Sequence, residues 1–183
     1  MSDDQSNEFN ADAPAWVTVE VPATAGGRLA LLGFPGLLMG ADSLSYIDPV
    51  EQNERFDQLY QHGCRRFYSF VHEDDVPADA LAQTQQTARQ NGIEFCWLPI
   101  TDFGIPDATT AERWQQQQAD LQTLLQQGQL IGLSCLSGIG RSGMMAADLL
   151  ANAGMTPDQA IAWVRQRLPE AIENPRQEAW VGS

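Results

Sequence analysis

One class of basic residue is missing from this chain altogether. None of the 183 residues is Lys, so Arg alone makes up the 10 basic residues, against 24 Asp and Glu. The resulting formal charge of -14 repels nucleic acid, anionic lipid and highly phosphorylated ligands at long range. We therefore expect no nucleic-acid and no membrane partner. Any anion site must be local, built from a few Arg side chains and oriented backbone N–H groups.

Cysteine and histidine are also scarce. The three cysteines, Cys64, Cys96 and Cys135, are odd in number and irregularly spaced, which excludes a complete disulfide framework. No pair of them has the spacing of zinc ligands, and two His residues are too few for a His-rich metal site. We predict no metal and no cofactor.

Long hydrophobic runs are absent as well. No segment approaches the roughly 18 apolar residues that a membrane-spanning helix needs. The first ten residues are acidic and polar, which is unlike a signal peptide or a membrane anchor. We expect a soluble, cytoplasmic protein in which residues 1–14 form a disordered acidic tail and residues 15–183 form a single domain.

The apolar segments alternate between strand and helix patterns. Strands are predicted at 16–20, 28–32, 66–71, 93–98 and 130–134, and helices at 49–62, 78–90, 110–127, 142–153 and 157–168. Strands that alternate with helices of this length favour an α/β fold, with a central, mainly parallel sheet flanked by helices.

The most informative segment lies between the strand at 130–134 and the following helix. It reads Cys135-Leu136-Ser137-Gly138-Ile139-Gly140-Arg141 and is followed by Ser142. The two glycines permit left-handed backbone angles, so the loop can turn successive N–H groups inward as an anion nest. The helix adds its positive N-terminal end, and Arg141 adds a planar fork that matches two phosphate oxygens. This pattern predicts a phosphate-binding loop.

The same positive surroundings act on the thiol of Cys135. A thiol beside a helix N-terminus and an Arg ionises readily, and the thiolate is the nucleophilic form. We predict that Cys135 is a nucleophile and that Ser142 donates its hydroxyl to the sulfur when the sulfur becomes the leaving group. The alternative is a buried structural cysteine on a glycine-rich turn.

The string Cys135-x2-Gly138-x2-Arg141-Ser142 resembles the signature of the cysteine-dependent protein tyrosine and dual-specificity phosphatase superfamily. Residues 99–106, with Asp102, resemble the mobile acid loop of that superfamily, and residues 171–180, with Gln177, resemble its late Gln-bearing loop. Taken together, residues 28–180 resemble the branch that contains kinase-associated phosphatase (cyclin-dependent kinase inhibitor 3). The resemblance implies the phosphotyrosine protein phosphatase-like fold.

The resemblance also implies a role for each matching residue. Cys135 attacks phosphorus, Arg141 binds the equatorial oxygens, and the backbone of Leu136, Ser137, Gly138, Ile139 and Gly140 holds the rest of the phosphate. Asp102 protonates the leaving oxygen and later takes a proton from the attacking water, as microscopic reversibility requires. Gln177 positions that water. The implied substrate is a phosphorylated protein or a small phosphomonoester: phosphotyrosine, with phosphoserine and phosphothreonine as further candidates. No protein partner is implied.

Two other residues near these segments have competing interpretations. Asp107 is a second candidate for the acid, but Pro106-Asp107 is more typical of a helix start. Cys96 precedes the acid loop, so it is either a buried apolar thiol or a disulfide partner for an oxidised Cys135. Cys64 is predicted to lie in the core.

Two departures from the superfamily pattern bear on efficiency. Ser134 replaces the His that usually precedes the cysteine, and Glu173 replaces an earlier Gln of the late loop. The carboxylate of Glu173 either points away from the phosphate site or slows hydrolysis. A catalytically weak phospho-binding module is therefore the alternative function. A phosphoinositide phosphatase is disfavoured, because positions 136–140 carry no basic residue.

Overall fold

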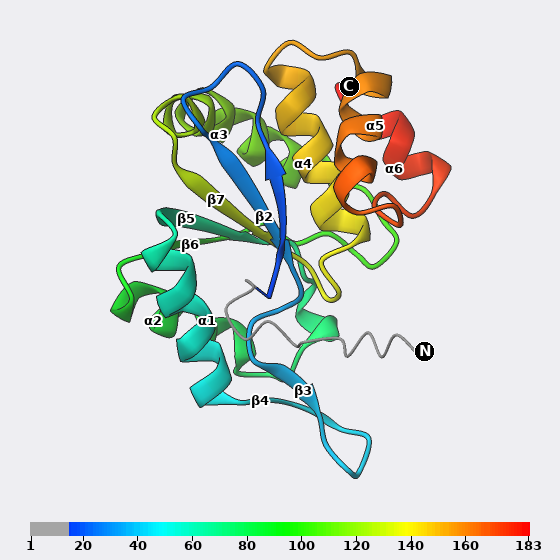
Figure 1. Ribbon diagram of the computed structural model, residues 1–183. Helices are drawn as coiled ribbons and strands as arrows, with labels where there is room; N and C mark the ends of the chain where they lie inside the picture. The colour runs from blue at the N-terminus through cyan, green and yellow to red at the C-terminus, as the bar shows by residue number, and fades with distance from the viewer. Residues whose placement is uncertain (1–14) are drawn as a thin grey trace, which may run out of the picture.

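A central sheet organises the molecule, seen here in a computed structural model that describes residues 15–183 (Figure 1). Its strands are β1 (Val17–Glu20), β2 (Arg28–Leu32), β5 (Cys64–Ser69), β6 (Glu94–Trp97) and β7 (Leu130–Ser134), in the order β1-β2-β7-β5-β6. Strand β1 pairs antiparallel with β2, and all the other pairs are parallel. The predicted α/β fold with a mainly parallel sheet is confirmed. The predicted tail, residues 1–14, lies outside the described residues.

Helices cover both faces of the sheet (Figure 1). They are α1 (Pro49–Gln61) and α2 (Ala80–Gln90) on one face, and α3 (Ala108–Gln126), α4 (Gly140–Asn152), α5 (Pro157–Arg167) and α6 (Pro175–Trp180) on the other. Strand β2 shows why two apolar layers form. Leu29 and Leu31 join the core beneath α3 and α4, whereas Ala30 and Leu32 join the core beneath α1 and α2. Alternate residues of a strand face opposite sides, so both faces of this strand are apolar.

Helix starts follow the capping residues of the sequence. The side chain of Asp48 accepts hydrogen bonds from Val50 N and Glu51 N at the start of α1. Thr156 and Gln159 form a reciprocal capping box at the start of α5. Each cap satisfies backbone donors that the first turn leaves free, and for this reason the predicted starts of these two helices are confirmed.

Four features differ from the sequence-based expectation. Strand β5 covers Cys64–Ser69 rather than 66–71, because its partner β7 ends at Ser134, opposite Ser69, where the chain turns into the Cys135 loop. A hairpin of β3 (Leu37–Met39) and β4 (Ser45–Ile47), the short helix α6 and a 3-10 turn, η1 (Glu73–Asp75), were not predicted. These elements have three to six residues each, too few to show a hydrophobic period.

The parallel strands determine where the site lies. The carboxyl ends of β5, β6 and β7 meet at one edge of the sheet, and the chain leaves them as η1, the acid loop (residues 98–107) and the Cys135 loop. Ligands of open α/β sheets bind at this edge. Within residues 15–183, no helix is long and apolar enough to cross a membrane.

Candidate active site

The Cys135 loop curls around its own sulfur. Cys135 is buried, and Gly138 N donates a hydrogen bond to its Sγ at 3.2 Å. Gly138 has a φ of +80°, and a Cβ at this position would collide with the carbonyl group of Leu32. Only glycine fits both the left-handed angle and the close approach to β2. The loop therefore brings a backbone donor to the sulfur in the way the sequence pattern predicts for an anion nest.

Arg141 is the second charged element of the site, and it is only 2% exposed. Its Nη1 donates to Asp75 Oδ2 at 2.5 Å and to the carbonyl oxygen of Ile100 at 2.8 Å, and its Nη2 lies 3.0 Å from Asp102 Oδ1. Both N–H groups of Nη1 are used in hydrogen bonds, whereas Nε–H and the two N–H groups of Nη2 make no hydrogen bond among residues 15–183, Nη2 having only its ion-pair contact with Asp102. Nε and Nη2 form one edge of the guanidinium, a geometry that suits bidentate binding of a phosphate.

Asp102 reaches Arg141 from the acid loop, which follows β6. Its side chain is about half exposed. The next residue, Phe103, has a φ of +55°, which is uncommon for a residue with a side chain, and it is 59% exposed. Two bonds from the late loop hold this segment: Asn174 Nδ2 donates to Phe103 O at 3.0 Å, and Gln177 Nε2 donates to Gly104 O at 3.3 Å. The acid loop is therefore docked with its carboxylate beside the guanidinium.

Gln177 is fully buried and joins two loops. Besides its bond to the acid loop, its Oε1 accepts a hydrogen bond from Glu173 N at 2.8 Å. The side-chain amide is thus bonded at both ends to main chain. Its predicted role in positioning a water stays a prediction, and in this structure the amide links the late loop to the acid loop.

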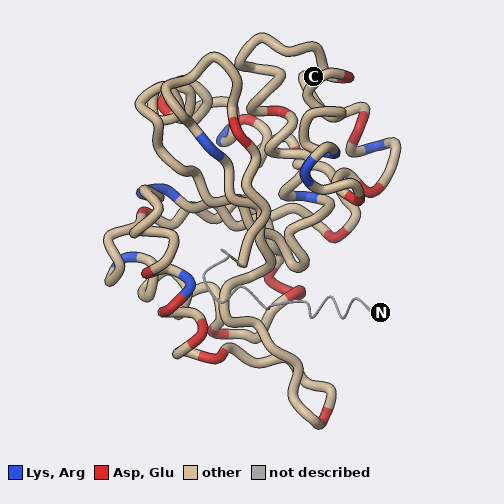
Figure 2. The backbone as a smooth tube through the Cα atoms, viewed as in Figure 1, with Lys and Arg blue, Asp and Glu red and all other residues tan. Residues whose placement is uncertain are grey.

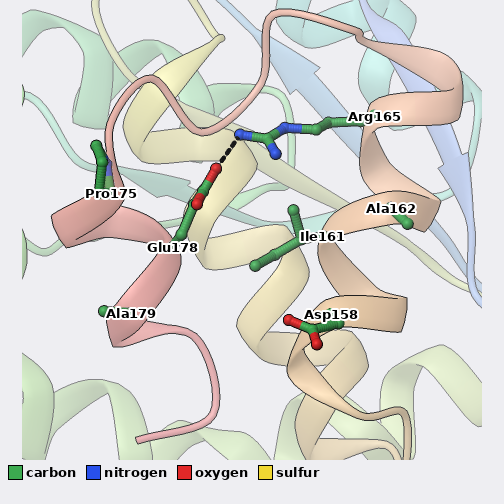
Figure 3. Close-up of a pocket in the computed structure, with 7 residues that line it drawn as sticks. All are labelled: Asp158, Ile161, Ala162, Arg165, Pro175, Glu178 and Ala179. Carbon is green, nitrogen blue, oxygen red and sulfur yellow. Dashed lines mark hydrogen bonds and ion pairs between the residues drawn. The ribbon is translucent and has the colours of Figure 1, made fainter.

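Arg165 of α5 supports the late loop from outside the site. It donates to the carbonyl oxygens of Ala171 at 2.9 Å and Ile172 at 2.8 Å, and it pairs with Glu178 at 2.7 Å (Figure 3). Ile172 has a φ of +64°, an outlier for a β-branched residue. The three bonds from the Arg165 guanidinium stabilise this strained backbone and thereby fix the direction in which the chain continues to residue 173.

That next residue, Glu173, faces the Cys135 loop. Its Oε2 occupies the space that a Cβ on Gly140 would need. Of the two expectations for this carboxylate, the one in which it points away is therefore wrong. Burial and the nearby charge of Asp102 raise the pKa of Glu173, and Arg141 acts in the opposite direction.

Three serine hydroxyls are buried around the loop without a hydrogen-bond partner among the described residues: Ser69, Ser134 and Ser142. Ser69 and Ser134 are neighbours at the ends of β5 and β7. The hydroxyl of Ser142 makes no bond to Cys135 in this structure, so its role as donor to the leaving sulfur stays a prediction.

The other two cysteines lie away from Cys135. Cys64 is a core residue as expected, and burial raises the pKa of its thiol to about 12. Cys96 on β6 pairs with Tyr68 of β5, which pairs with Leu133 of β7, so two strand spacings of about 4.8 Å separate Cys96 from β7. A disulfide needs Cα atoms within about 7 Å. The interpretation of Cys96 as a disulfide partner for Cys135 is therefore wrong for this arrangement of strands.

Asp107 is the N-cap of α3, where its Oδ1 accepts a hydrogen bond from Thr110 N at 2.7 Å. This confirms the helix-start interpretation over that of a second acid. In the part of the chain that the structure describes, no group of three or more His, Cys, Asp or Glu side chains is arranged to hold a metal ion.

Sequence reasoning missed three residues that hold the site together: Asp75, Asn174 and Arg165. Two of them act through a partner distant in sequence, 66 positions between Asp75 and Arg141 and 71 between Asn174 and Phe103, whereas Arg165 contacts residues 6 to 13 positions further on. The only local signal is for Asp75, an acidic residue shortly after a strand that ends at the site edge.

The fold and the loop together define a class of protein. The chain has the fold of the cysteine-dependent protein tyrosine and dual-specificity phosphatase superfamily, and its predicted resemblance to that superfamily is confirmed. No protein-family model matches the chain.

Two solved structures of this fold are similar to the chain over most of its length. A crystal structure of kinase-associated phosphatase, with its catalytic cysteine replaced by serine, matches with a TM-score of 0.75 and 20% identity over 93% of this chain and 94% of that chain. A solved structure of a proposed protein tyrosine phosphatase from Leishmania major matches with a TM-score of 0.65 and 19% identity over 91% and 96% of the two chains. At these identities, the matches establish the fold.

The curated relatives are similar over a shorter stretch. A "Probable protein tyrosine phosphatase type IVA B" of Dictyostelium discoideum is 30% identical over 87 residues, which are 46% of this chain and 53% of that protein. Its counterpart, type IVA A, is 29% identical over 81 residues. The chain spans about half the length of the curated relatives it matches.

Proposed function

We propose that residues 15–183 form a single dual-specificity-type phosphatase domain. It hydrolyses phosphomonoesters, phosphotyrosine foremost, through a phosphocysteine intermediate. The observation that carries the proposal is the bond from Gly138 N to Cys135 Sγ, in a loop that also ends on the buried Arg141. A donor aimed at sulfur stabilises a thiolate, and the same nest of donors and the free edge of Arg141 suit a phosphate.

The first step transfers the phosphoryl group to sulfur. The thiolate of Cys135 attacks phosphorus in line, so that an S–P bond forms while the bond between phosphorus and the ester oxygen breaks. The protonated carboxyl of Asp102 gives its proton to that oxygen, which leaves as an alcohol or phenol. Arg141 and the loop N–H groups stabilise the charge on the equatorial oxygens.

The second step regenerates the thiolate. A water attacks phosphorus, the carboxylate of Asp102 takes one of its protons, and the S–P bond breaks to give inorganic phosphate. Ser142 lies in the first turn of α4 and is proposed to donate its hydroxyl to the departing sulfur. These steps use side chains and backbone N–H groups of this chain together with one water molecule, and the proposed chemistry requires no metal ion.

The test is hydrolysis of p-nitrophenyl phosphate and of a phosphotyrosine peptide. We expect vanadate-sensitive turnover, loss of turnover in Cys135→Ser, and a decrease of roughly 10²–10⁴-fold in kcat for Asp102→Ala, the range of a general acid. Substrate binding by Cys135→Ser, followed by calorimetry, should persist. Normal turnover in Cys135→Ser would contradict the proposal, and unchanged kcat in Asp102→Ala would remove the acid assignment.

A phospho-binding module of the same fold is the second candidate, because a carboxylate beside the loop and Ser134 before the nucleophile both disfavour turnover. Rapid mixing with phosphopeptide distinguishes the two functions. Release of alcohol or phenol, with a burst where breakdown of phosphocysteine is the slow step, indicates an enzyme, whereas saturable binding with no release indicates a binding module.

A further inference from the structure

The carboxylate of Glu173 shares the mouth of the phosphate loop with two other charged groups. It comes from the late loop, Asp102 from the acid loop and Arg141 from α4, and the charges of both act on Glu173. Its Oε2 lies against Gly140, where any side chain on that residue would collide with it. An ionisable carboxyl from the late loop thus lies directly beside the loop that is proposed to hold a phosphate.

Backbone contacts fix this placement. Arg165 holds the carbonyl oxygens of Ala171 and Ile172, and Gln177 accepts a hydrogen bond from Glu173 N. The carboxylate itself has no hydrogen-bond or ion-pair partner among residues 15–183, and the contacts that Arg141 makes go to Asp75, Ile100 and Asp102 instead. Arg165 on α5 is likewise occupied by Glu178 and by the two carbonyl oxygens.

We propose that Glu173 is a proton-dependent gate on the phosphate loop. A phosphate dianion enters the loop when the Glu173 carboxyl is protonated, and the ionised carboxylate repels it. The inference rests on the proposed function, because it concerns occupation of the same loop. The protonated carboxyl replaces a repelling charge with an O–H donor that faces the anion.

The direction of the pH dependence follows from the charge. Because the protonated form admits the anion, kcat/KM falls as the pH rises through the pKa of Glu173. Desolvation and Asp102 raise that pKa, while Arg141 acts against them, so the fall is centred above the ordinary pKa of a Glu carboxyl. A neutral isostere of Glu at position 173 is expected to remove this part of the pH dependence of kcat/KM.

The experiment compares Glu173→Gln with the unmodified protein and with Glu170→Gln. Glu170 is an exposed residue three positions earlier, so this control removes the same charge from the same segment without touching the loop. The ratio of kcat/KM, Glu173→Gln over unmodified, should stay near unity at about pH 4.5 and rise about tenfold or more by about pH 7.5, since each pH unit above a pKa changes the protonated fraction tenfold. For Glu170→Gln the ratio should stay flat.

A binding measurement separates this inference from the proposed function. Calorimetric titration of inorganic phosphate into Cys135→Ser and into Cys135→Ser/Glu173→Gln needs no turnover. We expect the double variant to bind about tenfold or more tightly at about pH 7.5 and equally at about pH 4.5. If the two variants differ in phosphate affinity in this pH-dependent way but the unmodified protein shows no turnover, the result supports the role of Glu173 as a gate and overturns the proposed enzyme function. Turnover with a flat ratio supports the enzyme and overturns the gate.

Discussion

A single guanidinium connects most of the chemistry of this site. Arg141 is almost fully buried, and a buried charge is tolerated only where it is paired and hydrogen-bonded. Asp75 supplies that pairing from η1, and the carbonyl oxygen of Ile100 accepts a second hydrogen bond. Because these acceptors occupy both N–H groups of Nη1, they orient the guanidinium and leave Nε and Nη2 without a hydrogen bond among residues 15–183, with Nη2 ion-paired to Asp102. Asp75 is therefore a positioning residue for Arg141.

Replacing Asp75 tests this assignment. We expect Asp75→Asn to lower kcat/KM about 10- to 100-fold, since a small rotation of a phosphate-binding group has an effect of this size. The affinity of Cys135→Ser/Asp75→Asn for phosphate should fall in parallel. Steady-state kinetics and calorimetry provide the measurements.

The matched control is the neighbouring residue of η1. Asp74 is 87% exposed and pairs with His72 rather than with the site, so Asp74→Asn should leave both quantities unchanged. Equal behaviour of the two variants would show that Asp75 acts only through the overall charge of η1.

At the scale of elements, the site depends on how two loops dock. Asn174 has two separate tasks: its Oδ1 caps α6 by accepting from Arg176 N and Gln177 N, and its Nδ2 donates to Phe103 O of the acid loop. The cap stabilises α6, whereas the second bond holds the acid loop against the late loop. A substitution can separate these two tasks.

Asn174→Ser keeps an oxygen that can cap α6 and removes the N–H donor to Phe103. One hydrogen bond contributes about 1 kcal/mol, so we expect kcat to fall about three- to tenfold with little change in thermal stability. Asn174→Ala should lose the cap as well and lower the unfolding temperature. If kcat is unchanged in both variants, the bond does not position the acid loop.

Charge acts at the scale of the whole molecule. Acidic residues, red in Figure 2, are distributed over several elements, and the net charge is -14. A field of this sign attracts basic substrates and repels acidic ones until salt screens it. In the proposed function, the Cys135 loop and Arg141 would bind the phosphate, and the net charge of the molecule would favour basic residues in the substrate around it.

Two phosphotyrosine peptides, one flanked by Arg and one by Glu, test this effect. As NaCl rises from about 0.05 M to about 0.5 M, the screening length shortens severalfold, so kcat/KM should fall for the Arg peptide and rise for the Glu peptide. Turnover of p-nitrophenyl phosphate, which has no flanking charge, serves as the reference. Parallel responses of the two peptides would contradict long-range steering.

Local patterns in the sequence determined a large share of this protein. The alternation of strands and helices, the caps at Asp48, Asp107 and Thr156 and the loop from Cys135 to Arg141 depend on neighbours a few residues apart, and so they were predictable. Hydrophobic periodicity and helix capping depend on residues within one or two helical turns of each other.

Tertiary structure alone decided which side chains surround that loop. Asp75 meets Arg141 and Asn174 meets Phe103 only because parallel strands end at one edge and α5 holds the late loop against it. The direction of Glu173 likewise depends on a left-handed Ile172 and on three bonds from Arg165. The contacts of Asp75 with Arg141 and of Asn174 with Phe103 join residues far apart in the chain and leave no periodic trace in the sequence, because they arise from packing of whole elements.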